Sequence, residues 1–367
     1  MNMANTARFR HSAHYANVLG ELNSMYRAGG ASQSLSLSLF DDEEINIQAG
    51  REWAEKNAES DDQAAELCSD YPRVGARLVN LRVDPQSRIR WLEAALRSCR
   101  RLGDHKTEGR HLGELASVYA SLGNLSQAAD YHSESLKIAR KTGDPENEAA
   151  ALGNLANDSI QLNQPLPAVE YLQQSAKIYS NLRNTRGEAE ACNSLGVAYR
   201  MLQDYAGSVE YHLRSIELCQ SFGDARSEAN ARNNLGLTYR HQGDMEKALD
   251  CYMQALTIYR GLRDVRGEGQ ALDNLGTLYR LRGDFKTAID QHEDALRSYR
   301  KIEYKRGEAT ALFNIAFALE MQGRHQEAIS FAESALHLRE QIGDPRTDKI
   351  RKLLADCSKG DDLDGVR

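Results

Sequence analysis

The sequence predicts an all-helical superhelix of stacked helix pairs, on three observations. From about Asp104 to Gly343 the chain repeats itself with a period of 40 residues. Apolar residues within each copy are spaced three and four apart, as in amphipathic helices. Six prolines in 367 residues leave those helices largely uninterrupted. One phase of the repeat is marked by Leu115, Leu155, Leu195, Leu235, Leu275 and Ile315.

Each copy is predicted to contain two helices. In one copy a helix runs from Ser227 to Gln242, Gly243-Asp244 ends it, and a second helix runs from Met245 to Gly261. Glycine can adopt the left-handed conformation that ends a helix, and aspartate can cap the next one. The same signal, followed by a first-turn proline, stands at Gly143-Asp144-Pro145 and at Gly343-Asp344-Pro345. Six tandem units are therefore expected over residues 104–345.

The N-terminal part departs from the repeat. Residues 1–60 are expected to form a helical cap, with helices from Ala7 to Tyr26 and from Asp41 to Asn57. Gly29-Gly30 and a serine-rich stretch separate the two helices.

Two segments next to the repeats are expected to complete the stack. Residues 61–103 are predicted to be a degenerate further pair, irregular from Gln63 to Val83 and regular from Ile89 to Gly103. At the other end, a capping helix over 346–357 would seal the last unit, and a charged, disordered tail would follow over 358–367.

Composition narrows the function classes. The chain has no apolar run of 18 residues, so no membrane span is expected, and Met1 to Leu19 lack a secretory signal, which favours the cytoplasm. A net charge of -7 without a basic run argues against nucleic acid as a partner. Six scattered cysteines predict neither disulfides nor a metal site. Phosphate-loop, nucleophile-elbow and His-Glu-x-x-His signatures are absent, so we expect no enzyme and no cofactor.

Asn-Leu-Gly followed by Tyr, at 234–239 and again at 274–279, resembles the tetratricopeptide repeat. The 40-residue length is similar to the long-repeat type of spindle-orientation adaptors and of the sensor region in bacterial signalling ATPases of the STAND type. The resemblance implies a right-handed α–α superhelix whose first helices line a concave binding surface. Arg8-Phe9-Arg10-His11 and Asn46-Ile47-Gln48 also resemble segments that precede such repeats in those ATPases.

One polar column lies on the first helices of the units. Asparagine inside a helix costs several tenths of a kcal/mol against alanine, by order of magnitude, so a compensating role is expected. Its amide offers one acceptor and two donors, which suits the backbone of an extended peptide, and the column resembles the asparagine ladder of peptide-binding tetratricopeptide grooves. Alternatively, the amides bond between neighbouring repeats and only hold the stack together. The column is Asn154, Asn234, Asn274 and Asn314, with Ser194 and Glu114 at the same phase.

Residues beside the ladder could add selectivity. Helix phase places five further amides on or near this face, namely Asn157, Asn193, Asn230, Asn233 and Gln270. Arg200, Arg240 and Arg280 form a column at its edge, and three arginines would favour an acidic or carboxylate-bearing ligand. Alternatively, each arginine forms a solvent-exposed charge pair that contributes little to stability or binding.

Four other sets of residues at 40-residue spacing are expected to have structural roles. Tyrosines recur as core residues, helical glycines mark close helix approach, and histidines lie too far apart to share a metal. A further column of arginines stands two residues before glutamates in the first turn of a helix, and these residues are expected to contribute only to electrostatics at the helix start. The columns are Tyr119, Tyr199, Tyr239 and Tyr279; Gly196, Gly236 and Gly276; His132, His212 and His292; Arg186, Arg226, Arg266 and Arg306.

These features predict a protein-interaction scaffold or adaptor that binds an extended peptide or a partner protein in the concave groove. The alternative is a peptide-responsive bacterial regulator, or the sensor portion of a nucleotide-switched ATPase that lacks its ATPase domain. The scaffold would be rigid, whereas a regulator would change shape on binding. An enzyme using the N-terminal 60 residues is a third alternative. Self-association through 7–57 or 347–357 stays open.

Overall fold

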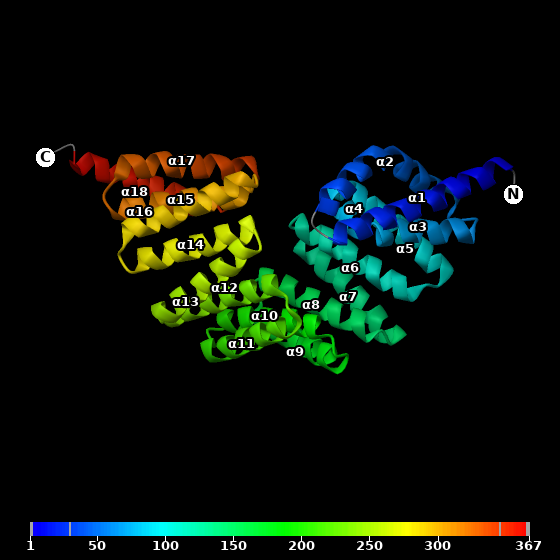
Figure 1. The fold of residues 1–367 in the computed structure, drawn as a ribbon, viewed down its shortest axis with the longest axis horizontal. Coiled ribbons are helices and arrows are strands. Elements are labelled where there is room, and N and C mark those ends of the chain that lie inside the picture. Colours follow the sequence, from blue (N-terminus) through cyan, green and yellow to red (C-terminus); the bar gives the residue numbers. More distant parts are fainter. Residues whose placement is uncertain (1–2, 29–30, 345, 365–367) are drawn as a thin grey trace. The chain divides into compact units, whose positions relative to one another are not determined.

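The computed structural model describes residues 3–28, 31–344 and 346–364 (Figure 1). Over these residues it contains eighteen α-helices and no strand, so the all-α prediction is confirmed. The chain divides into two compact units, Met1–Leu182 (unit 1) and Arg183–Arg367 (unit 2). None of the described helices is long and apolar enough to cross a membrane.

Unit 1 combines the N-terminal helices with the first repeats. Its core holds Leu19, Ile47 and Tyr71 in one buried cluster, so the expected cap and the degenerate pair share a core. The helices are α1 Met3–Ala28, α2 Ala31–Asn57, α3 Asp62–Val74, α4 Ala76–Arg82, α5 Pro85–Leu102, α6 His105–Ser121, α7 Leu125–Thr142, α8 Pro145–Gln161 and α9 Pro165–Asn181.

Two boundaries in unit 1 differ from the expectation. The serine-rich stretch is helical and forms the start of α2, because Phe40 packs into the core and Ser36 bonds the carbonyl of Gln33 at 2.9 Å. The irregular helix is two helices, α3 and α4, broken at Gly75. A Cβ at Gly75 would lie 2.6 Å from Leu19 Cδ2, so the break follows from a tertiary contact with α1. Gly29-Gly30 lie outside the described residues.

Unit 2 consists of four helix pairs and a final helix. Within each pair the helices pack together, and each first helix also contacts the first helix of the next pair, so α10, α12, α14 and α16 line up side by side. The helices are α10 Thr185–Met201, α11 Tyr205–Phe222, α12 Ala225–Gln242, α13 Met245–Gly261, α14 Val265–Leu281, α15 Phe285–Lys301, α16 Lys305–Met321, α17 His325–Gln341 and α18 Asp348–Asp364.

The C-terminal helix is longer than expected. α18 continues to Asp364, beyond Cys357, and so runs into the segment for which a disordered tail is expected. Pro345 and residues 365–367 lie outside the described residues.

The turns repeat with a 20-residue spacing. One residue in each turn has a positive φ, which glycine adopts without strain. Five of the thirteen positions are not glycine, yet they take the same conformation, so position in the repeat sets the turn. The glycines are Gly103, Gly123, Gly143, Gly223, Gly243, Gly283, Gly323 and Gly343; the others are Asn163, Arg183, Gln203, Arg263 and Glu303.

Candidate functional site

The asparagine column in unit 2 lies on neighbouring first helices, with Asn234 on α12, Asn274 on α14 and Asn314 on α16. All three side chains are half-buried. Each donates its amide Nδ2 to a residue of the preceding repeat: Asn234 to Asn193 Oδ1 at 3.1 Å, Asn274 to Asn233 Oδ1 at 2.9 Å and Asn314 to Asp273 Oδ1 at 3.5 Å. The amides thus link neighbouring repeats, as the structural alternative requires, but each of these bonds uses only one of the two amide hydrogens.

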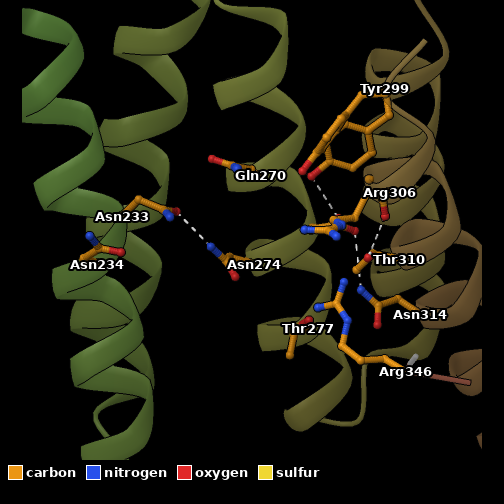
Figure 2. A pocket seen from close by; sticks show the side chains of 13 residues that line it. Asn233, Asn234, Gln270, Asn274, Thr277, Tyr299, Arg306, Thr310, Asn314 and Arg346 are labelled. Carbon is orange, nitrogen blue, oxygen red and sulfur yellow. Dashed lines mark hydrogen bonds between the residues drawn. The ribbon is translucent and has the colours of Figure 1, made fainter. Parts of the chain in front are cut away.

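A cavity of about 410 Å³ opens over these helices. It collects five of the predicted amides in one place: Asn233, Asn234, Gln270, Asn274 and Asn314. Figure 2 shows Asn233 and Asn234 on one side, Asn274 and Gln270 next to them, and Asn314 with Arg306 and Arg346 on the other side.

Aromatic rings from the second helices hold the acceptors of this network. His212 Nδ1 lies 3.1 Å from Asn193 Oδ1, and His292 Nδ1 lies 2.9 Å from Asp273 Oδ1. Tyr299 donates its hydroxyl to the other oxygen of Asp273 at 3.1 Å. Burial, with the charge of Arg200, lowers the pKa of His212 to about 3, so its ring is neutral and Nδ1–H is the donor to the asparagine oxygen.

The helical glycines make room for those rings. A Cβ at Gly196 would lie 2.5 Å from His212 Cε1, and one at Gly276 would lie 2.7 Å from His292 Cε1. The prediction of close helix approach at these glycines is confirmed. Two of the histidines in the column therefore position acceptors of the asparagine network: His292 holds Asp273, which lines the cavity, and His212 holds Asn193, which bonds to Asn234.

The arginine column is also present in unit 2. Arg200, Arg240 and Arg280 are half-buried, and none forms an ion pair with a described carboxylate. Nε of Arg200 is buried without a hydrogen-bond partner among the described residues. Burial, followed by the charge of Arg240, lowers the pKa of both Arg200 and Arg280. The guanidinium of Arg280 stacks over the Phe317 ring at 4.8 Å. These charges are therefore uncompensated within the part of the chain that is described.

The other predicted residues do not line the cavity, and this holds for Asn193 and the three arginines as well. Asn230 is exposed on α12 and accepts a hydrogen bond from the Tyr259 hydroxyl at 2.6 Å. Asn154 and Asn157 lie on α8 in unit 1, the first half-buried and the second exposed. The cavity therefore represents only the unit 2 part of the expected ladder.

Several residues that line the cavity are not among the predicted site residues. Asp273 stands 40 residues after Asn233 and 80 after Asn193, so the same periodicity could have identified it. Tyr299 comes from the second helix of a pair and Arg346 from the segment after the last repeat. The predicted columns contain first-helix positions, so they could not identify either residue. The sequence predicts only a role at a helix start for Arg306, but this residue also lines the cavity, and its Nε lies 3.8 Å from Asp344 Oδ2.

The sequence matches the family model of the tetratricopeptide repeat over residues 107–181, 187–261, 227–301 and 267–341. No curated protein matches the chain significantly.

Solved structures share the fold at low identity. Aspartyl phosphate phosphatase F from Bacillus subtilis is 11% identical with a TM-score of 0.63, covering 92% of this chain and 95% of that one. A Rap protein complexed with competence and sporulation factor is 14% identical with a TM-score of 0.58, covering 95% and 98%. A signal transduction ATPase with numerous domains and a tetratricopeptide repeat sensor, from Pyrococcus horikoshii, is 17% identical with a TM-score of 0.59, covering 88% and 50%. The chain thus spans about half the length of that ATPase.

Proposed function

Because the chain belongs to the tetratricopeptide repeat family, we propose that it is a protein-interaction scaffold whose unit 2 binds an extended peptide along α10, α12, α14 and α16. The family supports an interaction scaffold or sensor as the general role. The observation that carries the finer proposal is the cavity in which Asn234, Asn274 and Asn314 meet. The ligand is a peptide or an extended segment of a partner protein.

The asparagines suit a peptide backbone because their second amide hydrogen and their oxygen remain after the bond between repeats is made. That bond holds each amide in one orientation before the ligand arrives, which lowers the entropy lost on binding. Packed helices lie about 8–10 Å apart and an extended chain advances about 3.3 Å per residue. Each asparagine would therefore serve about three ligand residues.

The arginine column favours acidic side chains on that ligand. Half-buried cations without a carboxylate partner raise the free energy of the free protein, and a bound anion removes that cost. Since Arg200, Arg240 and Arg280 follow the same 40-residue spacing as the asparagines, an acidic residue at about every third ligand position would match both columns.

A peptide-responsive regulator is the second candidate. It is favoured by the likeness to the Rap protein, which covers 95% of this chain and therefore includes the N-terminal helices as well as the repeats. That protein is complexed with competence and sporulation factor. In this candidate, binding in unit 2 would change the conformation of the chain, because a switch requires different affinities for two states.

Selection from a random dodecapeptide library tests the scaffold proposal. Wild type is compared with an Asn234→Ala, Asn274→Ala, Asn314→Ala variant and with an Asn154→Ala, Asn157→Ala control from unit 1. We expect related peptides to be enriched on wild type and control but not on the triple variant. Equal enrichment on the triple variant would mean that the asparagines only hold the stack together.

Two controls complete this experiment. Circular dichroism confirms that the triple variant is folded, and Gln270→Ala, which lines the same cavity without a described hydrogen bond, serves as a milder second variant. Small-angle scattering with an enriched peptide then separates the candidates: a scaffold keeps its radius of gyration, whereas a regulator changes it.

A further inference from the structure

A second cavity lies in unit 2, where α16, α17 and the first turn of α18 meet, and has a volume of about 580 Å³. It shares Thr310, Asn314 and Arg346 with the first cavity, so the two adjoin. The residues that distinguish it are Phe313 of α16 and residues of α17 and α18, outside the columns assigned to the peptide.

Arg339 of α17 is the unusual group in this second cavity. Its side chain is buried, with a relative exposure of 8% for the residue, and no described carboxylate forms an ion pair with it. Nη1 donates to the carbonyl of Arg346, but Nε has no hydrogen-bond partner among the described residues. A buried guanidinium with an unsatisfied N–H is costly, so an anionic partner is expected. The Phe313 ring lies under the guanidinium, 6.0 Å away.

The start of α18 is a second, independent feature that favours an anion. Asp348, Lys349 and Ile350 are its first three residues, and all three line the cavity. The N–H group of Ile350 already donates to the carbonyl of Thr347 at 3.0 Å. The helix dipole makes this end of α18 positive. Lys349 is exposed and adds a full positive charge.

The surroundings limit the kind of anion. Arg346 is already engaged by Asp344, whose oxygens lie 2.9 and 3.2 Å from Arg346 Nε. Asp348 on the cavity wall repels a dianion such as phosphate more than a monoanion. Phe313, which is half-buried, offers an apolar contact.

We propose that this cavity is a binding site for a carboxylate carried on an apolar group. Arg339 and the first turn of α18 hold the carboxylate, and Phe313 contacts the apolar group. The carboxylate can come from a small acid or from the C-terminal residue of a chain in the adjoining cavity. Asn314 is the one ladder residue that lines this cavity, and Asn234 and Asn274 do not, so the site can be tested without a groove ligand.

Calorimetry with small probes tests the site. N-acetyl-L-phenylalanine and 3-phenylpropionate are expected to bind, whereas N-acetyl-L-phenylalaninamide and inorganic phosphate are expected to bind roughly tenfold more weakly or not at all. Preference for N-acetyl-L-phenylalanine over 3-phenylpropionate would identify a chain end as the source, and equal binding a small acid. If the amide binds as well as the acid, the proposal is wrong.

Variants assign the effect to the residues named. Arg339→Met should lower the affinity for N-acetyl-L-phenylalanine roughly tenfold or more, and Lys349→Glu about fivefold. Lys352 is an exposed α18 residue that does not line the cavity, so Lys352→Glu should leave this affinity unchanged. Lys349 is exposed, so its variant keeps the fold even if Arg339→Met does not. The ¹⁵N–¹H signal of Arg339 Nε should shift with the acid.

The proposals for the asparagine groove and for the second cavity can be refuted independently of each other. An Asn234→Ala, Asn274→Ala variant should lose library peptides yet bind N-acetyl-L-phenylalanine normally, because neither residue lines the second cavity. Undiminished acid binding in both Arg339→Met and Lys349→Glu would overturn the second site while leaving the groove proposal intact.

Discussion

Units 1 and 2 are built on the same repeat but carry different residues at the same positions. Where unit 2 has Asn193, Asn233 and Asp273, unit 1 has Gly113 and Gly153. Where unit 2 has Arg200, Arg240 and Arg280, unit 1 has Ala120 and Ile160. The stack therefore does not require these two columns, which supports the proposal that they bind a ligand in unit 2.

Features that occur in both units identify the scaffold. Ser175 in unit 1 and Ser215 in unit 2 both donate to a carbonyl of the adjacent first helix at 2.8 Å. An ion pair joins the end of one repeat to the start of the next in both units, Arg140 to Glu148 and Arg260 to Glu268, each at 2.8 Å. The described bonds in which an asparagine Nδ2 donates to the preceding repeat lie in unit 2.

The largest loss of stability at neutral pH is expected where unit 2 packs a tyrosine ring against a helical glycine. A Cβ at Gly236 would lie 2.6 Å from Tyr252 Cε1, so Gly236→Ala should lower the free energy of unfolding by about 1–3 kcal/mol. Unit 1 has Ala156 and Leu172 at these two positions. The double variant Gly236→Ala, Tyr252→Leu should therefore lose less than the sum of the single variants in urea denaturation. Strictly additive losses would contradict the account.

The pH dependence of stability tests the histidine that holds Asn193. The folded-state pKa of His212, about 3, lies below its ordinary 6.5, so the unfolded chain binds the extra proton as the pH falls. Stability should decrease from pH 6.5 towards 3, by at most about 1.4 kcal/mol per pH unit from this group. His212→Leu, which copies Leu172 of unit 1, should have a shallower slope over that window; an identical slope would count against a neutral buried ring.

Removing an uncompensated charge should stabilise the free protein. Arg240→Gln is expected to raise the free energy of unfolding by about 1 kcal/mol at low salt, because it relieves repulsion from Arg200 and Arg280. The gain should shrink in 1 M NaCl. The matched change Arg260→Gln breaks an ion pair with Glu268 and should be slightly destabilising. If Arg240→Gln destabilised the protein at low salt, the charge of Arg240 would be compensated in the free protein and this prediction would be wrong.

The smallest effect concerns the turns. Glu303 has φ 53°, so Glu303→Gly should stabilise unit 2 by about 0.5 kcal/mol in thermal denaturation. Asn163 in unit 1 has φ 57°, and because asparagine tolerates this conformation, Asn163→Gly should gain less. A loss at Glu303→Gly would show that its side chain contributes to the turn.

The 40-residue period predicted most of the fold, because helix pairs, turns and close-packed glycines repeat with it. It could not predict the break at Gly75, which depends on contact with Leu19 from a distant helix. It also gave no reason for Arg183 or Glu303 to adopt a positive φ, which the repeat geometry imposes. For the site, the asparagine and arginine columns were visible in the sequence. The contributions of Tyr299 and Arg346 depend on helices packing around the cavity.

The central claim, that unit 2 binds an acidic extended chain, is tested most directly by fluorescence anisotropy with two labelled dodecapeptides. One consists of four Glu-Ser-Thr triplets and the other of four Gln-Ser-Thr triplets. We expect wild type to bind the glutamate peptide about tenfold more tightly. That ratio should fall to about one in an Arg200→Gln, Arg240→Gln, Arg280→Gln variant. It should persist in Arg90→Gln, Arg97→Gln, Arg110→Gln, which removes the same charge from exposed positions of unit 1. An unchanged ratio in the unit 2 variant, or its loss in the unit 1 control, would contradict the account.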